Sequence, residues 1–309
     1  MNAIKVFAPA SVANVGCGYD TIGFAIDGLG DEITMSKRDD SKLVIDEIIG
    51  ADLPLAPEEN VATIAIQALL DHIGSKQGFN ITIKKLFKPG SGLGSSASSA
   101  AGAVFAANAL LGEPIEEKVD LLPFSLEGEA FASKCYHADN VAPSLMGGFN
   151  VIRSYEPELD IFQVNVPSDL WVLIIFPDVV IKTAESKKLI PTTLSIKDAR
   201  DQWSNVAGLI QAFNVHDFDL LKKSVTDLVA EPVRKGLIPG YDEVKALAFD
   251  HGSVGFNISG SGPSMFGFFK NEKEMNRAKP EIQKLYEGKK LPVILHASKI
   301  NLHGCEVID

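Results

Sequence analysis

Residues 89–104 constrain the possible folds of this chain more than any other stretch. Their sequence is Pro-Gly-Ser-Gly-Leu-Gly-Ser-Ser-Ala-Ser-Ser-Ala-Ala-Gly-Ala-Val, with three closely spaced glycines before a run of small residues. Glycine accepts positive φ and lets the backbone approach a ligand closely. The alanine-rich run from Ser95 to Leu111, followed by Gly112, predicts a buried helix that begins at this loop. Its free N–H groups and its dipole converge on the loop, an arrangement typical of phosphate binding.

The glycine loop differs from two common nucleotide-binding motifs. No Gly-Lys-Ser/Thr follows its last glycine, and the glycine spacing of dinucleotide-binding folds is absent. A glycine-serine linker before a core helix is the alternative. The ordered string Pro-x-x-Gly-Leu-Gly-Ser-Ser-Ala, however, resembles the ATP-binding motif of the GHMP kinases, which include galactokinases, homoserine kinases and mevalonate kinases. The resemblance implies ATP contacts from the following residues: Pro89, Gly90, Ser91, Gly92, Leu93, Gly94, Ser95, Ser96, Ala97, Ser98 and Ser99.

Composition limits the classes of function that remain. With 309 residues, of which 46% are hydrophobic, the chain can form two domains with apolar cores. Its formal net charge of −11 and the lack of a long basic run argue against a nucleic-acid partner. Three cysteines, at positions 17, 135 and 305, are too few for a disulfide framework or a structural zinc site. Because no signal peptide or membrane-length apolar run is visible, we expect a cytoplasmic protein without a membrane partner.

Residues 10–20 form a second cluster of candidate site residues. The pattern predicts a short apolar strand over residues 4–8, ending at Pro9, and then a polar, glycine-punctuated loop over 10–20. Asn14 and Asp20 could form only turn hydrogen bonds there. The string Pro-Ala-Ser-x-Ala-Asn-x-Gly-x-Gly-x-Asp, however, resembles the first motif of homoserine kinases, which implies that both side chains face an amino-acid substrate.

A third cluster runs from His137 to Gly148, with the sequence His-Ala-Asp-Asn-Val-Ala-Pro-Ser-Leu-Met-Gly-Gly. Together with Ala-Glu-Pro-x-Arg at residues 230–234, it resembles homoserine kinases within the GHMP family. The resemblance implies transfer of phosphate from ATP to the side-chain hydroxyl of L-homoserine, giving O-phospho-L-homoserine for threonine biosynthesis. Two alternatives are another GHMP small-molecule kinase, of the mevalonate or sugar type, and a non-catalytic ligand sensor on the same fold.

The chemistry of homoserine matches the candidate substrate residues. Its ammonium needs a carboxylate, and its carboxylate needs a cation. Asp139 and Asp20 fit the ammonium, and Arg234 fits the carboxylate. Asn14 could hold the terminal hydroxyl. The resemblance adds further substrate-site residues: His137, Thr183, Lys187 and Gly260.

Lys187 departs from the family pattern, because that position is usually arginine. Arginine can bind a carboxylate through two parallel N–H bonds, whereas lysine supplies a compact charge without that geometry. Either Lys187 still binds the substrate with less directional control, or it is a solvated charge and Arg234 acts alone. The first interpretation is preferred.

Phosphoryl transfer also needs a divalent metal, and Mg²⁺ with oxygen ligands is expected. By resemblance the protein ligands are a loop hydroxyl and a helical glutamate, matched by Ser96 and by Glu129, eight residues before His137. Glu127 is the competitor for the second role. Asp139 could accept the hydroxyl proton, but pairing with an ammonium would keep it weakly basic, so direct transfer without a general base is expected. The catalytic candidates are Asn14, Asp139, Ser96 and Glu129.

The remaining pattern predicts an alternating α+β fold. Asn60 caps an expected helix that ends at Gly74 and, by resemblance, also lies near the adenine. Residues 253–268 predict two strands around a glycine-serine turn, which resembles the third GHMP motif and includes Ser261. Further helices are expected over 196–213, 217–230, 241–250 and 272–287.

The resemblance implies the two-domain GHMP kinase fold. Its N-terminal α/β domain, similar to ribosomal protein S5, would cover residues 1–160, and a C-terminal ferredoxin-like α+β domain would cover 161–309. A homodimer is expected from the family.

Overall fold

The computed structural model of the protein describes residues 2–181 and 183–308, without the side chains of residues 183 and 184. The first half is built on a sheet of strand order β11-β1-β2-β4-β3, to which β5 and β6 are added from β2. β3 and β4 run parallel, and the other pairs are antiparallel. The strands are β1 (Ala3–Val15), β2 (Gly18–Lys37), β3 (Leu43–Ile49), β4 (Phe79–Lys85), β5 (Phe149–Ser154), β6 (Asp160–Val164) and β11 (Glu306–Ile308).

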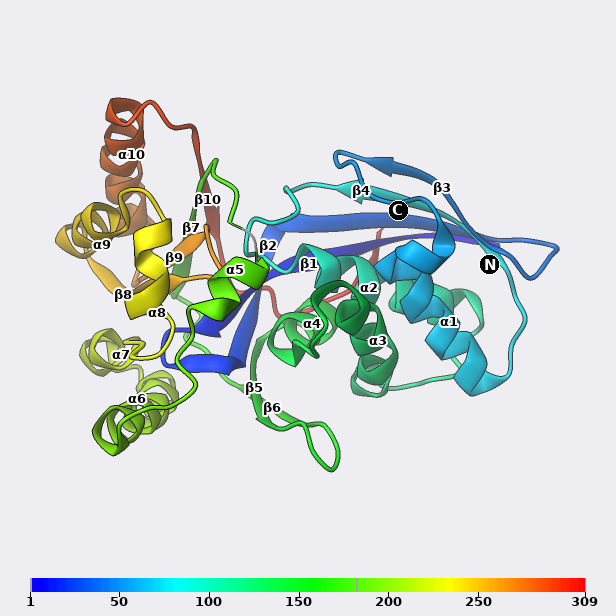
Figure 1. Ribbon diagram of the computed structural model, residues 1–309, viewed down its shortest axis with the longest axis horizontal. Helices are drawn as coiled ribbons and strands as arrows, with labels where there is room; N and C mark the ends of the chain where they lie inside the picture. Colours follow the sequence, from blue (N-terminus) through cyan, green and yellow to red (C-terminus); the bar gives the residue numbers. More distant parts are fainter. Residues whose placement is uncertain (1, 182, 309) are drawn as a thin grey trace.

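Helices α1 to α4 cover one face of this sheet (Figure 1). Small side chains let α2 pack closely against β1, β2 and the three other helices. At Gly102, for example, a Cβ atom would lie only 2.7 Å from Ile33 Cδ1. The helices are α1 (Val61–Ile73), α2 (Ser95–Leu110), α3 (Leu122–Ser133) and α4 (Ala138–Met146), with short 3₁₀ turns at Pro57–Glu59 and Lys118–Leu121. The predicted central helix after the glycine loop is confirmed.

The second half contains an antiparallel sheet of order β10-β7-β9-β8. Its strands are β7 (Trp171–Pro177), β8 (Ser253–Ile258), β9 (Met265–Phe269) and β10 (Val293–Ser298). Its helices are α5 (Thr183–Lys188), α6 (Ile196–Val215), α7 (Phe218–Ser224), α8 (Glu231–Arg234), α9 (Tyr241–Asp250) and α10 (Glu272–Gly288), with a 3₁₀ turn at Lys235–Leu237. This mixed architecture confirms the α+β prediction. Within the described residues, every helix is too short or too polar to cross a bilayer.

The two halves share an apolar core, which holds the candidate motifs in fixed positions. Phe24 of β2 lies 6.0 Å from Phe149 of β5 and 5.7 Å from Phe266 of β9, measured between ring centroids. Alternate residues of β7 serve two cores: Val172 packs with the first half, and Leu173 packs with the helices of the second half. The long strand β2 extends from the first sheet into this junction (Figure 1).

The predicted loop over residues 10–20 is wrong in most of its length. β1 continues through Pro9 to Val15, and the chain turns only at residues 16–17 before β2 begins. Proline has no N–H for the ladder, and the register of β1 against β2 shifts between Pro9 and Ser11. Residues 10–15 are buried on both faces, so the alternation that signals a half-exposed strand is missing.

Two other boundaries differ from the predictions. The expected domain division at residue 160 falls inside a strand pair, because β6 belongs to the first sheet through its pairing with β5. β11 returns the chain end to β1, so the first sheet also contains C-terminal residues. The helix expected over 217–230 ends at Ser224, because the residues that follow wrap around the Asp227 carboxylate.

Candidate active site

The three loop glycines have different roles. Gly90, Gly92 and Gly94 have φ values of 76°, 83° and 68°, a region that strongly favours glycine. A Cβ atom at Gly92 would lie 2.7 Å from the Ser259 carbonyl oxygen, and one at Gly94 would lie 2.3 Å from Ser11 Oγ. At Gly90 a Cβ atom would meet no described atom within 4 Å. Packing therefore requires Gly92 and Gly94, whereas Gly90 faces open space where a ligand can approach.

The turn between β8 and β9 supports the glycine loop. Ser259 Oγ donates to the Gly92 carbonyl at 2.6 Å, and the Ser264 amide donates to the Ser91 carbonyl at 3.1 Å. Through these bonds the turn between β8 and β9 packs beside the glycine loop. Ser261 lies in the same turn, and its carbonyl accepts a hydrogen bond from Ser186 Oγ of α5 at 3.1 Å.

A buried lysine anchors the first turn of α2. Lys85 Nζ lies 2.6 Å from Asp31 Oδ2 and donates to Ser95 Oγ and Ser99 Oγ at 2.9 and 2.7 Å. Both charged side chains are almost fully buried. Sequence reasoning missed this pair, although Asp31 and Lys85 are direct neighbours in the β2–β4 register. The available signal was a pair of opposite charges on two strands that alternate apolar and polar residues over part of their length.

Two serines of the predicted nucleotide-binding set turn their hydroxyls into the protein interior. The side chains of Ser98 and Ser99 are buried: Ser98 Oγ donates to the Ser95 carbonyl, and Ser99 Oγ is bound to Lys85 and Asp31. Their hydroxyls support the helix and are not available to a ligand. Among other residues of the predicted ATP set, Leu93 and Ala97 are buried, whereas Pro89 and Gly90 are exposed.

Ser91 and Ser96 are the loop hydroxyls best placed for a ligand. Ser91 Oγ is buried without a hydrogen-bond partner among the described residues. Ser96 Oγ donates to Glu129 Oε2 at 2.5 Å, and Glu129 Oε1 lies 3.1 Å from His137 Nδ1. Glu129 is only 4% exposed, whereas the competitor Glu127 is exposed and accepts a bond from the Tyr136 hydroxyl. The geometry favours Glu129 over Glu127 as a metal ligand.

Asn60 caps α1, as predicted. Its Oδ1 accepts from the Ala62 amide at 3.0 Å, and its Nδ2 donates to the Pro54 carbonyl at 2.8 Å, so both polar ends have local partners. A cavity of about 640 Å³ lies beside this helix start. It is lined mainly by apolar residues of β3, the following loop and α1: Lys42, Leu43, Val44, Ile45, Leu55, Pro57, Glu58, Thr63, Ile64 and Gln67.

Asp139 and Asn14 connect the first and third clusters. Asp139 is 1% exposed; its Oδ2 accepts from the Asn14 amide at 3.3 Å, and its Oδ1 has no partner among the described residues. Burial, assisted by the charge of Asp20, raises the pKa of Asp139 to about 7. Asn14 Oδ1 accepts from the Asp20 amide at 2.7 Å. Asn14 and Asp20 both have positive φ, at 56° and 54°. The structure therefore brings Asn14, Asp20 and Asp139 together.

His137 is linked to the same carboxylates. Burial favours its neutral ring, but the hydrogen bond to Glu129 and the charge of Asp139 outweigh burial and raise the pKa of His137. The ring therefore connects the proposed metal ligand Glu129 with the acid cluster that includes Asp20.

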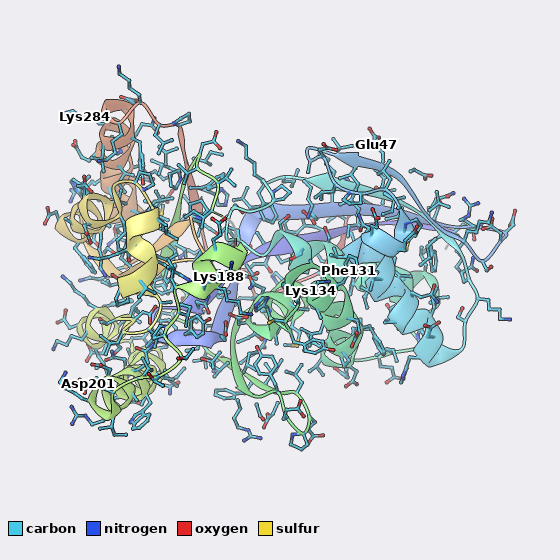
Figure 2. The ribbon with its side chains drawn as sticks, in the orientation of Figure 1. Glu47, Phe131, Lys134, Lys188, Asp201 and Lys284 are labelled. Carbon is cyan, nitrogen blue, oxygen red and sulfur yellow. The ribbon has the colours of Figure 1, made fainter. Side chains whose placement is uncertain are left out.

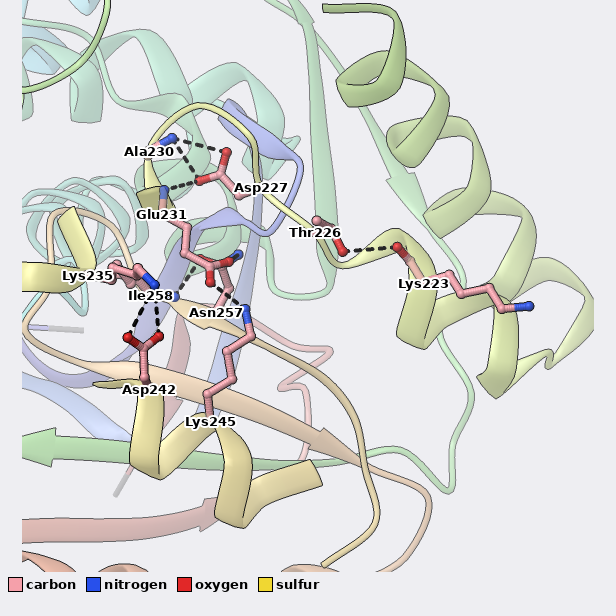
Figure 3. Close-up of polar contacts among 10 residues, drawn as sticks. All are labelled: Lys223, Thr226, Asp227, Ala230, Glu231, Lys235, Asp242, Lys245, Asn257 and Ile258. Carbon is pink, nitrogen blue, oxygen red and sulfur yellow. Dashed lines mark hydrogen bonds and ion pairs between the residues drawn. The ribbon is translucent and has the colours of Figure 1, made fainter. Parts of the chain in front are cut away.

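Arg234 enters the site from the end of α8. It is 4% exposed, its Nη1 donates to the Gly260 carbonyl at 3.0 Å, and its Nε has no partner among the described residues. The carboxylate of Asp227 holds the start of α8 by accepting from the backbone amides of Ala230 and Glu231 (Figure 3). Glu231 in turn binds Lys245 and Asn257. The position of Arg234 is thus fixed by a buried polar network.

The residues of α5 are less deeply placed. Lys187 is exposed, and its Nζ lies 2.6 Å from Cys135 Sγ. Lys188, labelled in Figure 2, lies in the middle of the molecule, where α5 faces the end of α3 near Lys134. The side chain of Thr183 lies outside the described residues.

The site can bind an anion at a glycine loop beside a buried acid and a buried cation. In the described part of the chain, no three His, Cys, Asp or Glu side chains are grouped so that they could hold a metal ion. What the arrangement provides chemically is a place to align a phosphate donor with a small polar acceptor.

Comparison with known proteins places this site in a family context. The chain matches the GHMP kinases N terminal domain over residues 60–148 and the GHMP kinases C terminal domain over residues 209–288. Homoserine kinase from Chloroherpeton thalassium is 41% identical over 280 residues, 87% of each chain. Homoserine kinase from Pyrococcus abyssi is 36% identical over 277 residues, 90% of this chain and 91% of the relative. A crystal structure of homoserine kinase from Cytophaga hutchinsonii has a TM-score of 0.96 at 41% identity, covering 100% of this chain and 98% of that one.

Proposed function

The chain belongs to the GHMP kinase family, and from this premise we propose that it is a homoserine kinase. It transfers the γ-phosphate of ATP to the side-chain hydroxyl of L-homoserine and releases ADP and O-phospho-L-homoserine. This reaction is a step of threonine biosynthesis, and we place it in the cytoplasm. The homodimer expected from the family stays a prediction.

One observation carries the substrate class: two buried polar atoms of opposite character lack partners among the described residues, Asp139 Oδ1 and Arg234 Nε. A buried polar atom without a partner costs roughly 1–3 kcal/mol, so a ligand that satisfies both is favoured. A zwitterionic amino acid supplies an ammonium to Asp139 and a carboxylate to Arg234. A neutral sugar or an isoprenoid acid has no ammonium and would leave Asp139 unsatisfied.

The nucleotide would extend from the cavity beside α1 to the glycine loop. The apolar lining of the cavity suits a purine ring, and the helix cap Asn60 lies in the chain between two lining residues, Glu58 and Thr63. A Cβ atom at Gly128 would lie 2.4 Å from the Val61 carbonyl oxygen, so the start of α1 lies against α3 next to Glu129. In this proposal the adenine would lie in the cavity beside α1, and the phosphates would lie next to it at the glycine loop. Ser91 Oγ and the open backbone at Gly90 would contact the phosphates.

Ser96 and Glu129 fit the requirements of Mg²⁺. A hydroxyl and a carboxylate only 2.5 Å apart supply hard oxygen ligands, and Mg²⁺ commonly takes one or two from protein and the rest from phosphate and water. When bound, the metal neutralises charge on the transferring phosphate. His137 holds the other oxygen of Glu129 and so fixes the orientation of the carboxylate.

In this proposal the residues of the chain mainly orient the reactants. Asn14 Oδ1 is occupied by the Asp20 amide, so Asn14 Nδ2 is the group that donates to the homoserine hydroxyl oxygen. Asp139 binds the ammonium in its ionised form, and the ammonium charge then lowers its basicity. The hydroxyl proton leaves to phosphate or water, without an obligatory general base.

A panel of acceptors tests the proposed function. ADP release from ATP is measured with homoserine, mevalonate and galactose, and the phosphorylated product is identified. We expect turnover with homoserine alone. Faster turnover of either other compound would favour another GHMP kinase, and binding of homoserine without ADP release would favour a sensor.

A charge-removing variant tests the substrate contact. Arg234→Leu removes a charge-assisted contact worth roughly 1.5–3 kcal/mol, about a tenfold to hundredfold rise in KM for homoserine. KM for ATP should change far less, and 3-aminopropanol, which lacks the carboxylate, should react equally with both enzymes. Lys235→Leu is the matched control, because the neighbouring Lys235 is paired with Asp242 (Figure 3). An equal loss for both acceptors would show that Arg234 is structural.

A further inference from the structure

Tyr19, which no motif singled out, lies between the acid cluster and Arg234. It is half-buried, and the Arg234 guanidinium carbon lies 5.5 Å from the centre of its ring. The following residue, Asp20, belongs to the acids expected at the substrate ammonium. Tyr19 therefore occupies the boundary between the two charged ends of the proposed amino-acid site.

The surroundings of Arg234 are unusual for a buried cation. Among the described residues, no carboxylate forms an ion pair with it, and its Nη1 donates a hydrogen bond to the Gly260 carbonyl. A guanidinium carries five N–H donors, and burying it without support is costly. An aromatic face attracts a cation without neutralising it, typically by about 0.5–2 kcal/mol. The ring of Tyr19 thus supports the guanidinium and leaves its charge available to an anion.

The chain segments that carry Tyr19 and Arg234 are linked by the side chains of Gln202 and Asp227. The carbonyl of Cys17, two residues before Tyr19, accepts from Gln202 Nε2 at 2.8 Å. The same Gln202 nitrogen lies 3.2 Å from Asp227 Oδ1. Asp227 also holds the start of α8, the helix that carries Arg234 (Figure 3). The start of β2 and helix α8 are therefore held by the same buried hydrogen bonds, which keep the Tyr19 ring and the Arg234 guanidinium close together.

The other side of Tyr19 is also fixed. The Asp20 amide is bound by Asn14 Oδ1, and the Asp20 carbonyl accepts from the Tyr155 hydroxyl at 3.2 Å. Burial, followed by the charge of Asp20, raises the pKa of Tyr19, so the phenol stays neutral in neutral solution. A neutral ring held on both sides is suited to set the plane of the guanidinium.

We propose that Tyr19 is a positioning residue for substrate selection: its ring fixes the Arg234 guanidinium in the orientation that binds the carboxylate of the amino-acid acceptor. The inference rests on the proposed function, because it takes the acceptor to be an amino acid. It adds a determinant of specificity that acts through Arg234 and not through contact with the reacting atoms. Removal of the ring would loosen the guanidinium without removing its charge.

Tyr19→Leu tests this role in steady-state assays with ATP. Loss of a cation–π contact of about 0.5–2 kcal/mol predicts a rise in KM for homoserine of roughly twofold to thirtyfold. KM for ATP and kcat should change much less, and 3-aminopropanol should react as with the wild type. Tyr19→Phe, which keeps the ring, should raise KM for homoserine less than Tyr19→Leu. The matched control is Trp171→Leu, which removes the β7 ring that packs against the Lys299 ammonium. It should have no effect on KM for homoserine.

A double-mutant cycle separates positioning from general support of the fold. If Tyr19 acts through Arg234, Tyr19→Leu should have no further effect on KM for homoserine in an Arg234→Leu background. Additive losses, or equal losses with 3-aminopropanol, would overturn the inference. Absence of homoserine turnover by the wild type would instead reject the proposed function. Normal wild-type turnover with an unchanged KM in Tyr19→Leu would reject only the role of Tyr19.

Discussion

The glycine loop leaves one neutral hydroxyl, Ser91 Oγ, buried without a partner among the described residues, whereas the proposed amino-acid pocket leaves buried atoms of two charged groups without partners. The loop is supported by Ser259 and by the buried Lys85 beneath Ser95. In the pocket, Asp139 Oδ1 and Arg234 Nε have no partners among the described residues. The loop thus has its shape before a ligand arrives, and the pocket has unsatisfied polar groups that a ligand can complete.

This difference teaches how the nucleotide part and the amino-acid part of the site recognise their ligands. Phosphate is bound by backbone groups and short hydroxyls, which a single segment of chain can supply. In the proposed pocket the amino acid would be bound by single charged side chains that come from distant segments and are costly to bury. Substitutions on the nucleotide side should therefore act through geometry, and substitutions on the amino-acid side should act through charge.

The largest effect is expected on the nucleotide side. Glu129→Ala removes a carboxylate oxygen from the proposed metal and should lower kcat by at least about a hundredfold, since transition-state charge is then less well stabilised. Added Mg²⁺ should restore little activity, because the ligand itself is missing. The measurement is the rate of ADP release across a Mg²⁺ titration, together with Mn²⁺ binding in the presence of ATP.

Glu127→Ala is the matched control for this prediction. Glu127 lies on the same helix but is exposed and paired only with the Tyr136 hydroxyl in the described structure. It should keep nearly the wild-type rate. An inactive Glu127→Ala beside an active Glu129→Ala would move the metal site along α3 and away from Ser96.

The second effect tests charge on the amino-acid side through pH. The pKa of Asp139 is about 7, and only the ionised form binds an ammonium. kcat/KM for homoserine should therefore fall about tenfold per pH unit below 7 and level off above it. Asp139→Asn should lower kcat/KM at pH 8 and remove this pH dependence. If kcat itself follows the same pKa in the wild type, Asp139 also acts as a base.

Asp139→Asn should stabilise the fold at pH 8, although it lowers kcat/KM at that pH. The folded-state pKa of Asp139 is raised above the ordinary value, so the folded protein binds a proton more tightly than the unfolded chain. The ionised carboxylate consequently destabilises the fold most above pH 7, and this cost shrinks as the pH falls toward 4. Asp139→Asn should melt at a higher temperature than the wild type at pH 8. A lower melting temperature at pH 8 would show that the carboxylate stabilises the fold.

The contrast also explains which parts of the site could be predicted from sequence. The glycine loop and α2 are one continuous motif, so local spacing was enough to predict them. The eight-residue separation of Glu129 from His137 in the sequence favours Glu129 over Glu127 as a metal ligand. The burial of the Glu129 side chain supports that prediction. These features depend on neighbouring residues, where helix periodicity and loop chemistry are informative.

Features that depend on distant contacts were missed or mistaken. The Asp31–Lys85 pair forms only when β2 and β4 align, and it turns Ser99 inward where a nucleotide contact was expected. Tyr19 gains its significance from Arg234, which follows more than two hundred residues later in the chain. β11 is only three residues long and pairs with β1 of the first sheet, so no local sequence pattern predicted it. Tertiary pairing decided each of these cases.

A smaller effect on the nucleotide side tests geometry alone. Gly90→Ala adds a methyl group where no described atom lies within 4 Å, so the methyl would occupy the space through which a phosphate approaches the backbone. KM for ATP should rise, and KM for homoserine should change less. Gly112→Ala is the control, because Gly112 also has positive φ and open space but lies at the far end of α2. Unchanged ATP affinity in a folded Gly90→Ala protein would show that this part of the loop does not approach phosphate.

The smallest expected effect concerns Lys187, which stands on α5 at the edge of both halves. It is exposed, with Nζ near Cys135 Sγ, and exposed ion pairs contribute only about 0–1 kcal/mol. If it faces the substrate, Lys187→Arg supplies a second pair of N–H donors and should lower KM for homoserine by up to about threefold, with no change for 3-aminopropanol. Lys188→Arg on the same helix is the control. A gain confined to homoserine would add α5 to the amino-acid half of the site, whereas equal values for all three proteins would leave the carboxylate to Arg234.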